Sequence, residues 1–277
     1  MKKINLLIVL ILIVGACNTD DDNNPPNTSL PYLFQDGFES VNDDLDDLFP
    51  SDGSRWTGIQ LVNPNNGDNA IELEKTTATE GSYSLKFLSK PGDEILSKVD
   101  IEKTGFSAPI GSSVKIEADF LINNTNENLK ELFLLDLECC SCWDPSVANN
   151  QCPGVRLKIS GDNNYLSIER GKILGSTISQ VTQSFPLQEW VNVRWEMTLA
   201  PNESGENRLF INQEEVIRES GKNMPNADEF RDEFAASGVD FNLRAPITYE
   251  RLQIGATANP TQYEVEILVD NFKMSVE

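Results

Sequence analysis

Short stretches with an apolar residue at every second position dominate the chain from Leu30 onward. Stretches 114–122, 155–159 and 191–199 alternate apolar and polar side chains, and turn sequences such as PNNGD and SGDNN separate them from their neighbours. A period of two is typical of a β-strand with one buried face. The same pattern predicts further strands at 33–38, 82–88, 95–101, 132–139, 165–170, 208–211, 251–256 and 265–276.

Helical periodicity is limited to a short stretch at 226–234, where Asn226 can cap the helix and acidic residues occupy its first turn. Many antiparallel strands joined by polar turns predict an all-β fold with two packed sheets, a sandwich or jelly roll. No internal repeat or second boundary is visible. We therefore expect residues 30–277 to form a single domain.

The N-terminus has the order of a secretory signal: two lysines, an apolar run over 6–14, and two small residues before Cys17. The run is shorter than the ~20 apolar residues that cross a bilayer. Val14-Gly15-Ala16-Cys17 also resembles the lipobox of bacterial lipoproteins. That resemblance implies removal of residues 1–16 and lipidation of Cys17; an ordinary signal peptide with an incidental cysteine is the alternative.

Residues 17–29 follow with the polar sequence NTDDDNNPPNTS after the cysteine. This segment has no apolar residue to bury, which predicts a disordered, extended tether. Its acidic run resembles the surface-export signal of some Gram-negative lipoproteins. The resemblance implies an anchored position on the outer face of the outer membrane, whereas a plain solvated spacer is the other interpretation.

The charge balance and the absence of histidine exclude several classes of function. The chain has 44 acidic and 22 basic residues, a net charge of −22, and no histidine. A negative field of this size repels nucleic acid and favours cations. Without histidine there is no Ser-His-Asp or Cys-His catalytic machinery and no imidazole metal site.

Four cysteines lie close together at Cys139, Cys140, Cys142 and Cys152, within a loop spanning 139–152. An even set in an exported protein predicts two disulfides, in any of three pairings. A four-cysteine zinc site is the alternative, because Cys139 and Cys142 have C-x-x-C spacing; no second such pair exists.

Several segments resemble the concanavalin A-like, or laminin-G-like, jelly-roll superfamily when taken in order. They are Asp36-Gly37-Phe38-Glu39, Ala78–Leu85 (ATEGSYSL), Trp190–Trp195 (WVNVRW), Arg208–Asn212 (RLFIN) and Val269–Phe272 (VDNF). This superfamily contains lectins, carbohydrate-binding modules, glycoside hydrolases and polysaccharide lyases, so the fold does not fix the function.

The resemblance also implies that the first and last strands pair. Asp36 and Glu39 would then lie near Asp270 and Asn271, and related modules often hold a structural calcium ion there. Calcium takes six to eight oxygen ligands, which such residues supply. The alternative is that these residues only bond their own backbone at strand ends.

The hairpin at 155–170 is the first candidate glycan site. With a turn at Asp162-Asn163, Arg156 lies opposite Glu169 and Lys158 opposite Ser167, and Tyr165 shares their face. Such a face can hydrogen-bond sugar hydroxyls. An ordinary cross-strand ion pair between Arg156 and Glu169 accounts for the pattern equally well.

Trp143 is a second candidate, since it lies in the polar, cysteine-rich loop. A rigid, exposed indole offers a platform to the apolar face of a sugar ring. Alternatively, the indole packs over the disulfides as a small core for the loop. We expect Trp56 and Trp195 to lie in the main core.

Catalytic motifs are incomplete. Glu117 and Asp119 share a strand face, but the third acid expected of related hydrolases is missing. A lyase needs a base and a group that neutralises a uronate carboxylate, for which Tyr165, Lys158 and Arg156 are the candidates. Arg194 and Glu196 only faintly resemble a lyase R-x-E motif.

Three functions therefore remain open. The first is a surface lipoprotein whose jelly roll binds a polysaccharide or oligosaccharide without chemistry. The second is a polysaccharide lyase or glycoside hydrolase of the same fold, and the third is a structural or adhesion protein of the envelope. Apart from a structural Ca²⁺, no cofactor is expected.

Overall fold

Alternating apolar side chains are buried between two antiparallel sheets, as the period of two predicts. This computed structural model describes residues 31–62, 69–91, 97–124, 129, 131–144, 146, 152–171, 176–259 and 263–277. The expected signal, Cys17 and the tether lie outside the described residues. Residues from Pro31 to Glu277 form one structural unit.

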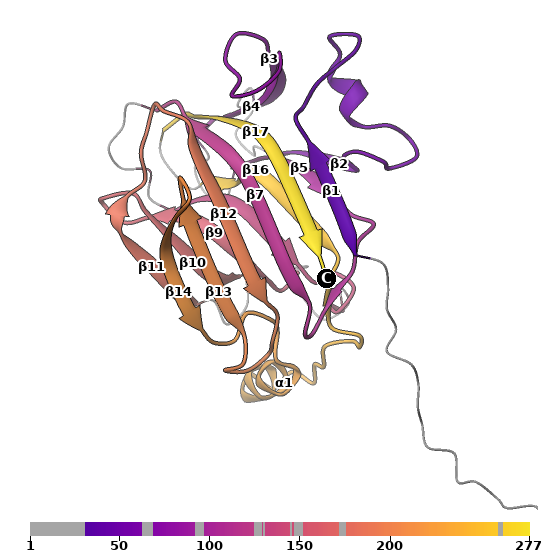
Figure 1. Cartoon of the computed structure of the whole chain (residues 1–277). Helices are drawn as coiled ribbons and strands as arrows, with labels where there is room; N and C mark the ends of the chain where they lie inside the picture. Colours follow the sequence, from indigo (N-terminus) through magenta and orange to yellow (C-terminus); the bar gives the residue numbers. More distant parts are fainter. Residues whose placement is uncertain are drawn as a thin grey trace, which may run out of the picture. The chain divides into compact units, whose positions relative to one another are not determined.

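The larger sheet, here called sheet A, faces the viewer in Figure 1. Its strand order is β14-β13-β12-β7-β17-β4-β3, and β1 also pairs with β17. The strands are β1 (Tyr32–Asp36), β3 (Ala70–Glu74), β4 (Ser84–Ser89), β7 (Ser113–Ile122), β12 (Val191–Thr198), β13 (Glu206–Ile211), β14 (Glu214–Ser220) and β17 (Val265–Val276). The pairing of the first and last strands, from Tyr32 opposite Val276 to Asp36 opposite Phe272, is therefore confirmed.

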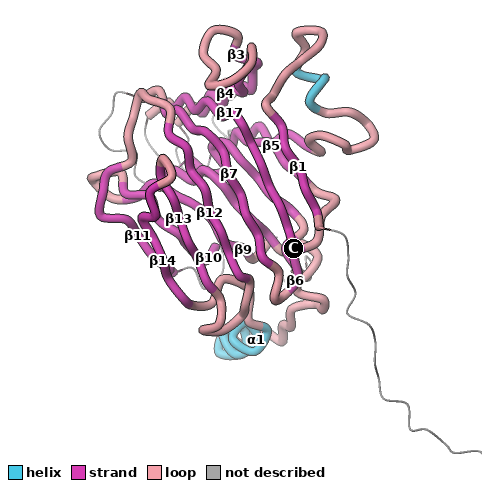
Figure 2. The backbone as a smooth tube through the Cα atoms, in the orientation of Figure 1, coloured by secondary structure: helices cyan, strands magenta, loops and turns pink. Residues whose placement is uncertain are grey.

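The second sheet, sheet B, lies behind the first (Figure 2) and has the order β11-β10-β9-β8-β16-β5-β2. The strands are β2 (Gly58–Val62), β5 (Ser97–Lys103), β8 (Leu132–Glu138), β9 (Gly154–Ser160), β10 (Tyr165–Gly171), β11 (Ser176–Ser184) and β16 (Arg251–Asn259). A short pair, β6 (Ala108–Pro109) with β15 (Thr248–Tyr249), stands apart from both sheets. The two-sheet antiparallel jelly roll that the sequence predicts is confirmed.

Aromatic packing closes the sandwich where the first and last strands meet. Trp56 is fully buried, with its ring centroid 5.2 Å from Phe34, 5.8 Å from Phe38 and 5.0 Å from Phe272. Rings of this size bury the largest apolar areas available to a core. Trp195 is also buried, so the predicted core positions of both tryptophans are confirmed.

The apolar pattern missed four strands of the two large sheets, namely β2, β3, β11 and β14. They are the outermost strands of the two sheets. In β11 only Val181 is buried, and in β14 only Ile217. An edge strand covers less core and keeps polar side chains, which weakens the apolar alternation.

Helix α1 (Ala227–Ala236) lies at one end of the sandwich (Figure 1). Asn226 caps it as predicted, since its Oδ1 accepts hydrogen bonds from the backbone N–H groups of Asp228 and Glu229. A single 3₁₀ turn, Leu45–Leu48, precedes β2. None of the helices that the structure describes is long and apolar enough to cross a membrane.

Candidate functional site

The outer face of sheet B carries a row of polar side chains that runs from β5 to β11. The strand registers place in one line Glu102, Gln253, Asp136, Arg156, Glu169 and Thr177, and the line ends at Gly58 on β2. Their chain neighbours point inward, because successive side chains alternate between the two faces. The residues of this line, together with the residues two positions before and after them on the same strands, are called the polar face of sheet B.

The register predicted for the β9–β10 hairpin is confirmed: Leu157 pairs with Ile168, Arg156 with Glu169 and Lys158 with Ser167. The ion pairs differ from the expectation. Glu169 pairs with Lys158, and Arg156 lies 3.8 Å from Asp136 on β8. The expected Arg156–Glu169 ion pair is therefore wrong.

The position of the Arg156 guanidinium explains this difference. It lies 4.7 Å from the ring centroid of Phe133 and so close to Gly171 that a Cβ there would overlap it. The face of an aromatic ring attracts a cation, and only glycine leaves the room this position requires. The guanidinium consequently lies against Phe133 and Gly171 and does not pair with Glu169.

Lys158 is a fixed cation in this face. Its side chain is 9% exposed, and its ammonium pairs with Glu169 and, at 2.9 Å, with Glu131. Burial lowers the pKa of Lys158, but the hydrogen bonds that its ammonium donates to the two carboxylates outweigh burial and raise the pKa overall. Lys158 therefore stays protonated and is poorly suited to accept a proton.

A second network lies across β5 and β16. The Arg251 guanidinium donates to Glu138 Oε2 at 2.8 and 2.5 Å and lies 3.4 Å from Glu102 Oε1. Glu102 Oε1 also accepts from the side-chain amides of Gln60 at 2.6 Å and Gln253 at 2.7 Å. The carboxylates in this part of the face are thus held by protein donors.

Asp100 differs from its neighbours. Its carboxyl is fully buried on the same face and makes no hydrogen bond with a described residue. Burial raises the pKa of Asp100 well above its ordinary value, Lys98 lowers it, and the charges of Asp136, Glu102 and Glu138 raise it further. Asp100 accordingly holds its proton to a higher pH than an ordinary aspartate does.

The accessible part of the face lies on β10 and β11. Tyr165 and Glu169 are half-buried, whereas Thr177 and Gln180 are exposed. The Tyr165 hydroxyl accepts a hydrogen bond from the Asn163 amide at 3.0 Å, and Gln180 donates to Ser160 Oγ at 3.1 Å. These hydroxyl, amide and carboxylate groups can both donate to and accept from sugar hydroxyls.

Sequence reasoning found the hairpin residues of this face but missed Asp100, Asp136, Glu138, Arg251 and Gln253. Their polar positions alternate with apolar ones in 99–102, 135–138 and 251–254, which is a usable signal. What the sequence lacks is the strand order β5-β16-β8-β9, which brings these segments together.

The expectation of an exposed Trp143 is wrong. Trp143 is 2% exposed, and its ring centroid lies 4.5 Å from that of Phe241 and 5.8 Å from that of Phe234. The sequence could not show that the segment after α1 covers the indole. Trp143 packs as a core residue, close to the second interpretation, and has no free face for a sugar ring.

The four cysteines form two disulfides, Cys139–Cys142 and Cys140–Cys152. Within the part of the chain that the structure describes, the one group with metal-ligand spacing is Glu138, Cys140 and Cys152. Two of its three ligand atoms are disulfide sulfurs, which do not act as thiolate ligands. The disulfide interpretation holds over the zinc alternative.

Three of the four calcium candidates accept hydrogen bonds from protein donors, and the fourth, Asn271, donates through its side-chain amide to Thr79 and Asp119. Asp36 binds the Arg55 guanidinium at 2.6 and 2.9 Å, and Glu39 accepts from the backbone of Ser82 and Tyr83. Asp270 accepts from Thr79 at 2.8 and 2.9 Å and from the Asn271 backbone at 2.7 Å.

Two of these candidates, Asp36 and Asn271, line a common pocket of about 290 Å³ together with Glu80. Glu39 is not among the residues that line it. The pocket therefore combines two of the predicted ligands with an acid, Glu80, that the sequence did not single out.

The incomplete catalytic motifs lie on the other sheet. Glu117 and Asp119 are on β7 and Arg194 on β12, where Asn192 donates to both carboxylates at 3.4 and 2.8 Å. Tyr165, Lys158 and Arg156 are on sheet B. The two sets therefore belong to different sheets and do not form one catalytic group.

Comparison with models of protein families and with curated proteins gives no match to this sequence. Solved structures do resemble it. The endo-β-1,4-glucuronan lyase of the fungus Trichoderma reesei has a TM-score of 0.59 and 12% identity, over 79% of this chain and 90% of that one. The cellulose-induced protein Cip1 has a TM-score of 0.51 and 14% identity, over 80% and 93%. At these identities the likeness shows the fold alone.

The buried Asp100 carboxyl predicts a specific pH dependence of stability. Above the ordinary value of 3.8, the folded state holds a proton that the unfolded state releases, so stability falls as pH rises towards the folded pKa. Asp100→Asn should raise the free energy of unfolding at pH 7 and flatten its fall with pH, measured by urea denaturation from pH 4 to 8. The exposed Asp240→Asn is the control; equal curves for Asp100→Asn and the unmodified protein would contradict this assignment.

Proposed function

We propose that the domain binds a polysaccharide or oligosaccharide on the polar face of sheet B and does not cleave it. The observation that carries this proposal is the pairing of the cations on that face: Arg156 with Asp136, Lys158 with Glu131 and Glu169, and Arg251 with Glu138 and Glu102. Lyase chemistry is favoured by a cation that is free to neutralise a substrate carboxylate. Paired cations leave the face suited to neutral hydroxyl groups.

The similar folds support a role with glycans. One neighbour is a glucuronan lyase and the other a cellulose-induced protein, and both share the two-sheet architecture with this chain. A fold of this kind supports many unrelated functions, so binding is inferred from the paired side chains of the polar face of sheet B.

Catalysis by the same face is the alternative, and Tyr165 favours it. Tyr165 is the accessible phenol of the face, and its hydroxyl already accepts one hydrogen bond from Asn163. A tyrosine can act as general acid or base in proton abstraction next to a carboxylate. A structural or adhesion role of the envelope is the third candidate.

A glycan array followed by calorimetry tests the binding proposal. Tyr165→Phe and Gln180→Ala should each weaken binding of an array hit by roughly fivefold, since one lost hydrogen bond is worth about 1 kcal/mol. Glu219→Gln, an exposed carboxyl on β14 of sheet A, is the matched control and should leave binding unchanged. Unsaturated or reducing-end products that disappear in Tyr165→Phe would overturn the binding-only proposal in favour of an enzyme.

We also propose that the chain is anchored to the outer membrane through lipid on Cys17, with the domain on the cell surface. The support is the sequence before and after Cys17. Cys17→Ser should abolish labelling with radioactive palmitate and release the protein from the membrane fraction. Changing the acids at 20–22 to Asn should keep the label but remove access to external protease. Retained labelling in Cys17→Ser would rule out the anchor.

A structural calcium ion is proposed for the pocket that contains Asp36, Glu80 and Asn271. Carboxylate and amide oxygens are ligands that calcium prefers. If the ion binds the folded state, a chelator should lower the melting temperature, and Asn271→Ala should reduce that shift. An identical melting temperature with chelator and with added calcium would count against the site.

A further inference from the structure

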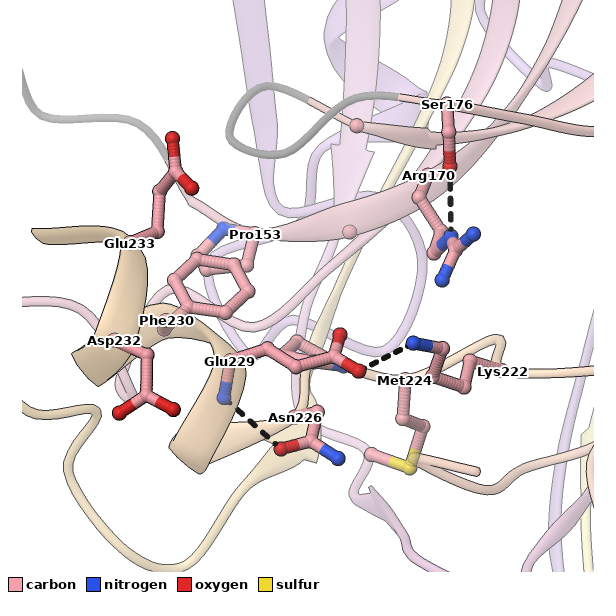
Figure 3. Close-up of a pocket in the computed structure, with 13 residues that line it drawn as sticks. Pro153, Arg170, Ser176, Lys222, Met224, Asn226, Glu229, Phe230, Asp232 and Glu233 are labelled. Carbon is pink, nitrogen blue, oxygen red and sulfur yellow. Dashed lines mark hydrogen bonds and ion pairs between the residues drawn. The ribbon is translucent and has the colours of Figure 1, made fainter. Parts of the chain in front are cut away.

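A second pocket lies between the ends of β9 and β10 and helix α1 (Figure 3). Its volume is about 520 Å³. Pockets that hold small molecules commonly measure about 300–1,000 Å³. Gly154 and Gly171, which pair across β9 and β10, form part of its lining.

Arg170 on β10 projects into this pocket (Figure 3). Its Nε donates to Ser176 Oγ at 3.1 Å. No carboxylate of the described residues pairs with it, whereas every other arginine in the chain pairs with an Asp or Glu. The chain has 44 acidic and 22 basic residues, so an arginine that pairs with no carboxylate is unusual and indicates a role for its guanidinium.

The other charges around the pocket are largely compensated. Lys222 pairs with Glu229, and Asp232 accepts from Arg231 at 3.0 Å. The α1 N-terminus is also satisfied, because the Asn226 side chain accepts from its first free N–H groups. Among the described residues that line the pocket, Arg170 is thus the cation that is not paired with a carboxylate.

The rest of the lining sets what kind of anion can enter. Met224 and Phe230 are 2% and 5% exposed, and Pro153 and Pro225 are also buried, which gives the pocket an apolar wall. Glu233 of α1 adds negative charge to the lining. Repulsion by this carboxylate disfavours ligands with two or more negative charges.

We propose that this pocket binds a small organic monocarboxylate with an apolar body. The planar guanidinium of Arg170 matches a carboxylate with two parallel N–H···O hydrogen bonds, and the apolar body packs against Phe230 and Met224. This site is independent of the proposed glycan face, because it uses none of Tyr165, Glu169 or Gln180.

The test uses 3-phenylpropionate as the probe and 3-phenylpropanamide as its neutral counterpart, with binding measured by calorimetry on the full chain. The acid should bind, and the amide and the dianion phenyl phosphate should bind at least tenfold more weakly. Arg170→Gln should weaken binding of the acid at least tenfold. Arg170→Lys, which keeps the charge but not the planar fork, should retain part of it. Arg244→Gln, an arginine paired with Asp144 outside the pocket, is the control and should bind as the unmodified protein does.

Three results would overturn the proposal: no measurable binding of the acid, equal binding of acid and amide, or unchanged binding in Arg170→Gln. Melting curves of each variant show whether the fold is intact. Because Arg170 makes a single hydrogen bond through its side chain among the described residues, the substitution should move the melting temperature little.

Discussion

The properties of this domain depend on how the charges on the outer face of sheet B are paired. Arg156 and Lys158 are 9% and 7% exposed, and Asp136 and Glu138 are 3% and 1% exposed. Removing one partner of such a buried pair costs about 3–5 kcal/mol, because the other charge remains without compensation. The carboxylates are therefore fixed to their cations. The same ion pairs that stabilise the face leave these cations unavailable to neutralise a carboxylate of a ligand.

This constraint connects the fold to the proposed function. Sandwich packing buries the apolar half of each strand and places the polar half on the outer face. Where the outer face is itself buried, each charged side chain needs a partner of opposite charge. A ligand can therefore reach only the accessible border of the face, which consists of Tyr165, Glu169, Thr177 and Gln180. Arg170 is the contrasting case, since it lies in a pocket and has no such partner.

The fold could be predicted from the sequence because the central strands alternate clearly between apolar and polar residues. In β17 the predicted bounds, 265–276, agree with the structure, and the register of the β9–β10 hairpin followed from its turn. The edge strands could not be found in this way, since β11 and β14 each bury a single side chain. Polar edges are what a sheet needs to avoid pairing with other chains, so this loss of signal has a physical cause.

The candidate site was predictable only in part. Residues of one hairpin are close in sequence, so Arg156, Lys158, Tyr165 and Glu169 could be grouped. Asp100 and Arg251 join the same face through strands far apart in the chain, and the contact between Trp143 and Phe241 depends on a loop whose path the sequence does not give. The predicted ion pair between Arg156 and Glu169 is wrong because Gly171 and Phe133 determine where the Arg156 guanidinium lies.

The most direct test of the central claim is a crystal structure of the protein soaked with an oligosaccharide that it binds. The account predicts an intact oligosaccharide over β10 and β11, with hydrogen bonds to Tyr165, Glu169 or Gln180 and with the Lys158–Glu169 pair unbroken. A cleaved product on that face, or an oligosaccharide bound to sheet A, would contradict it.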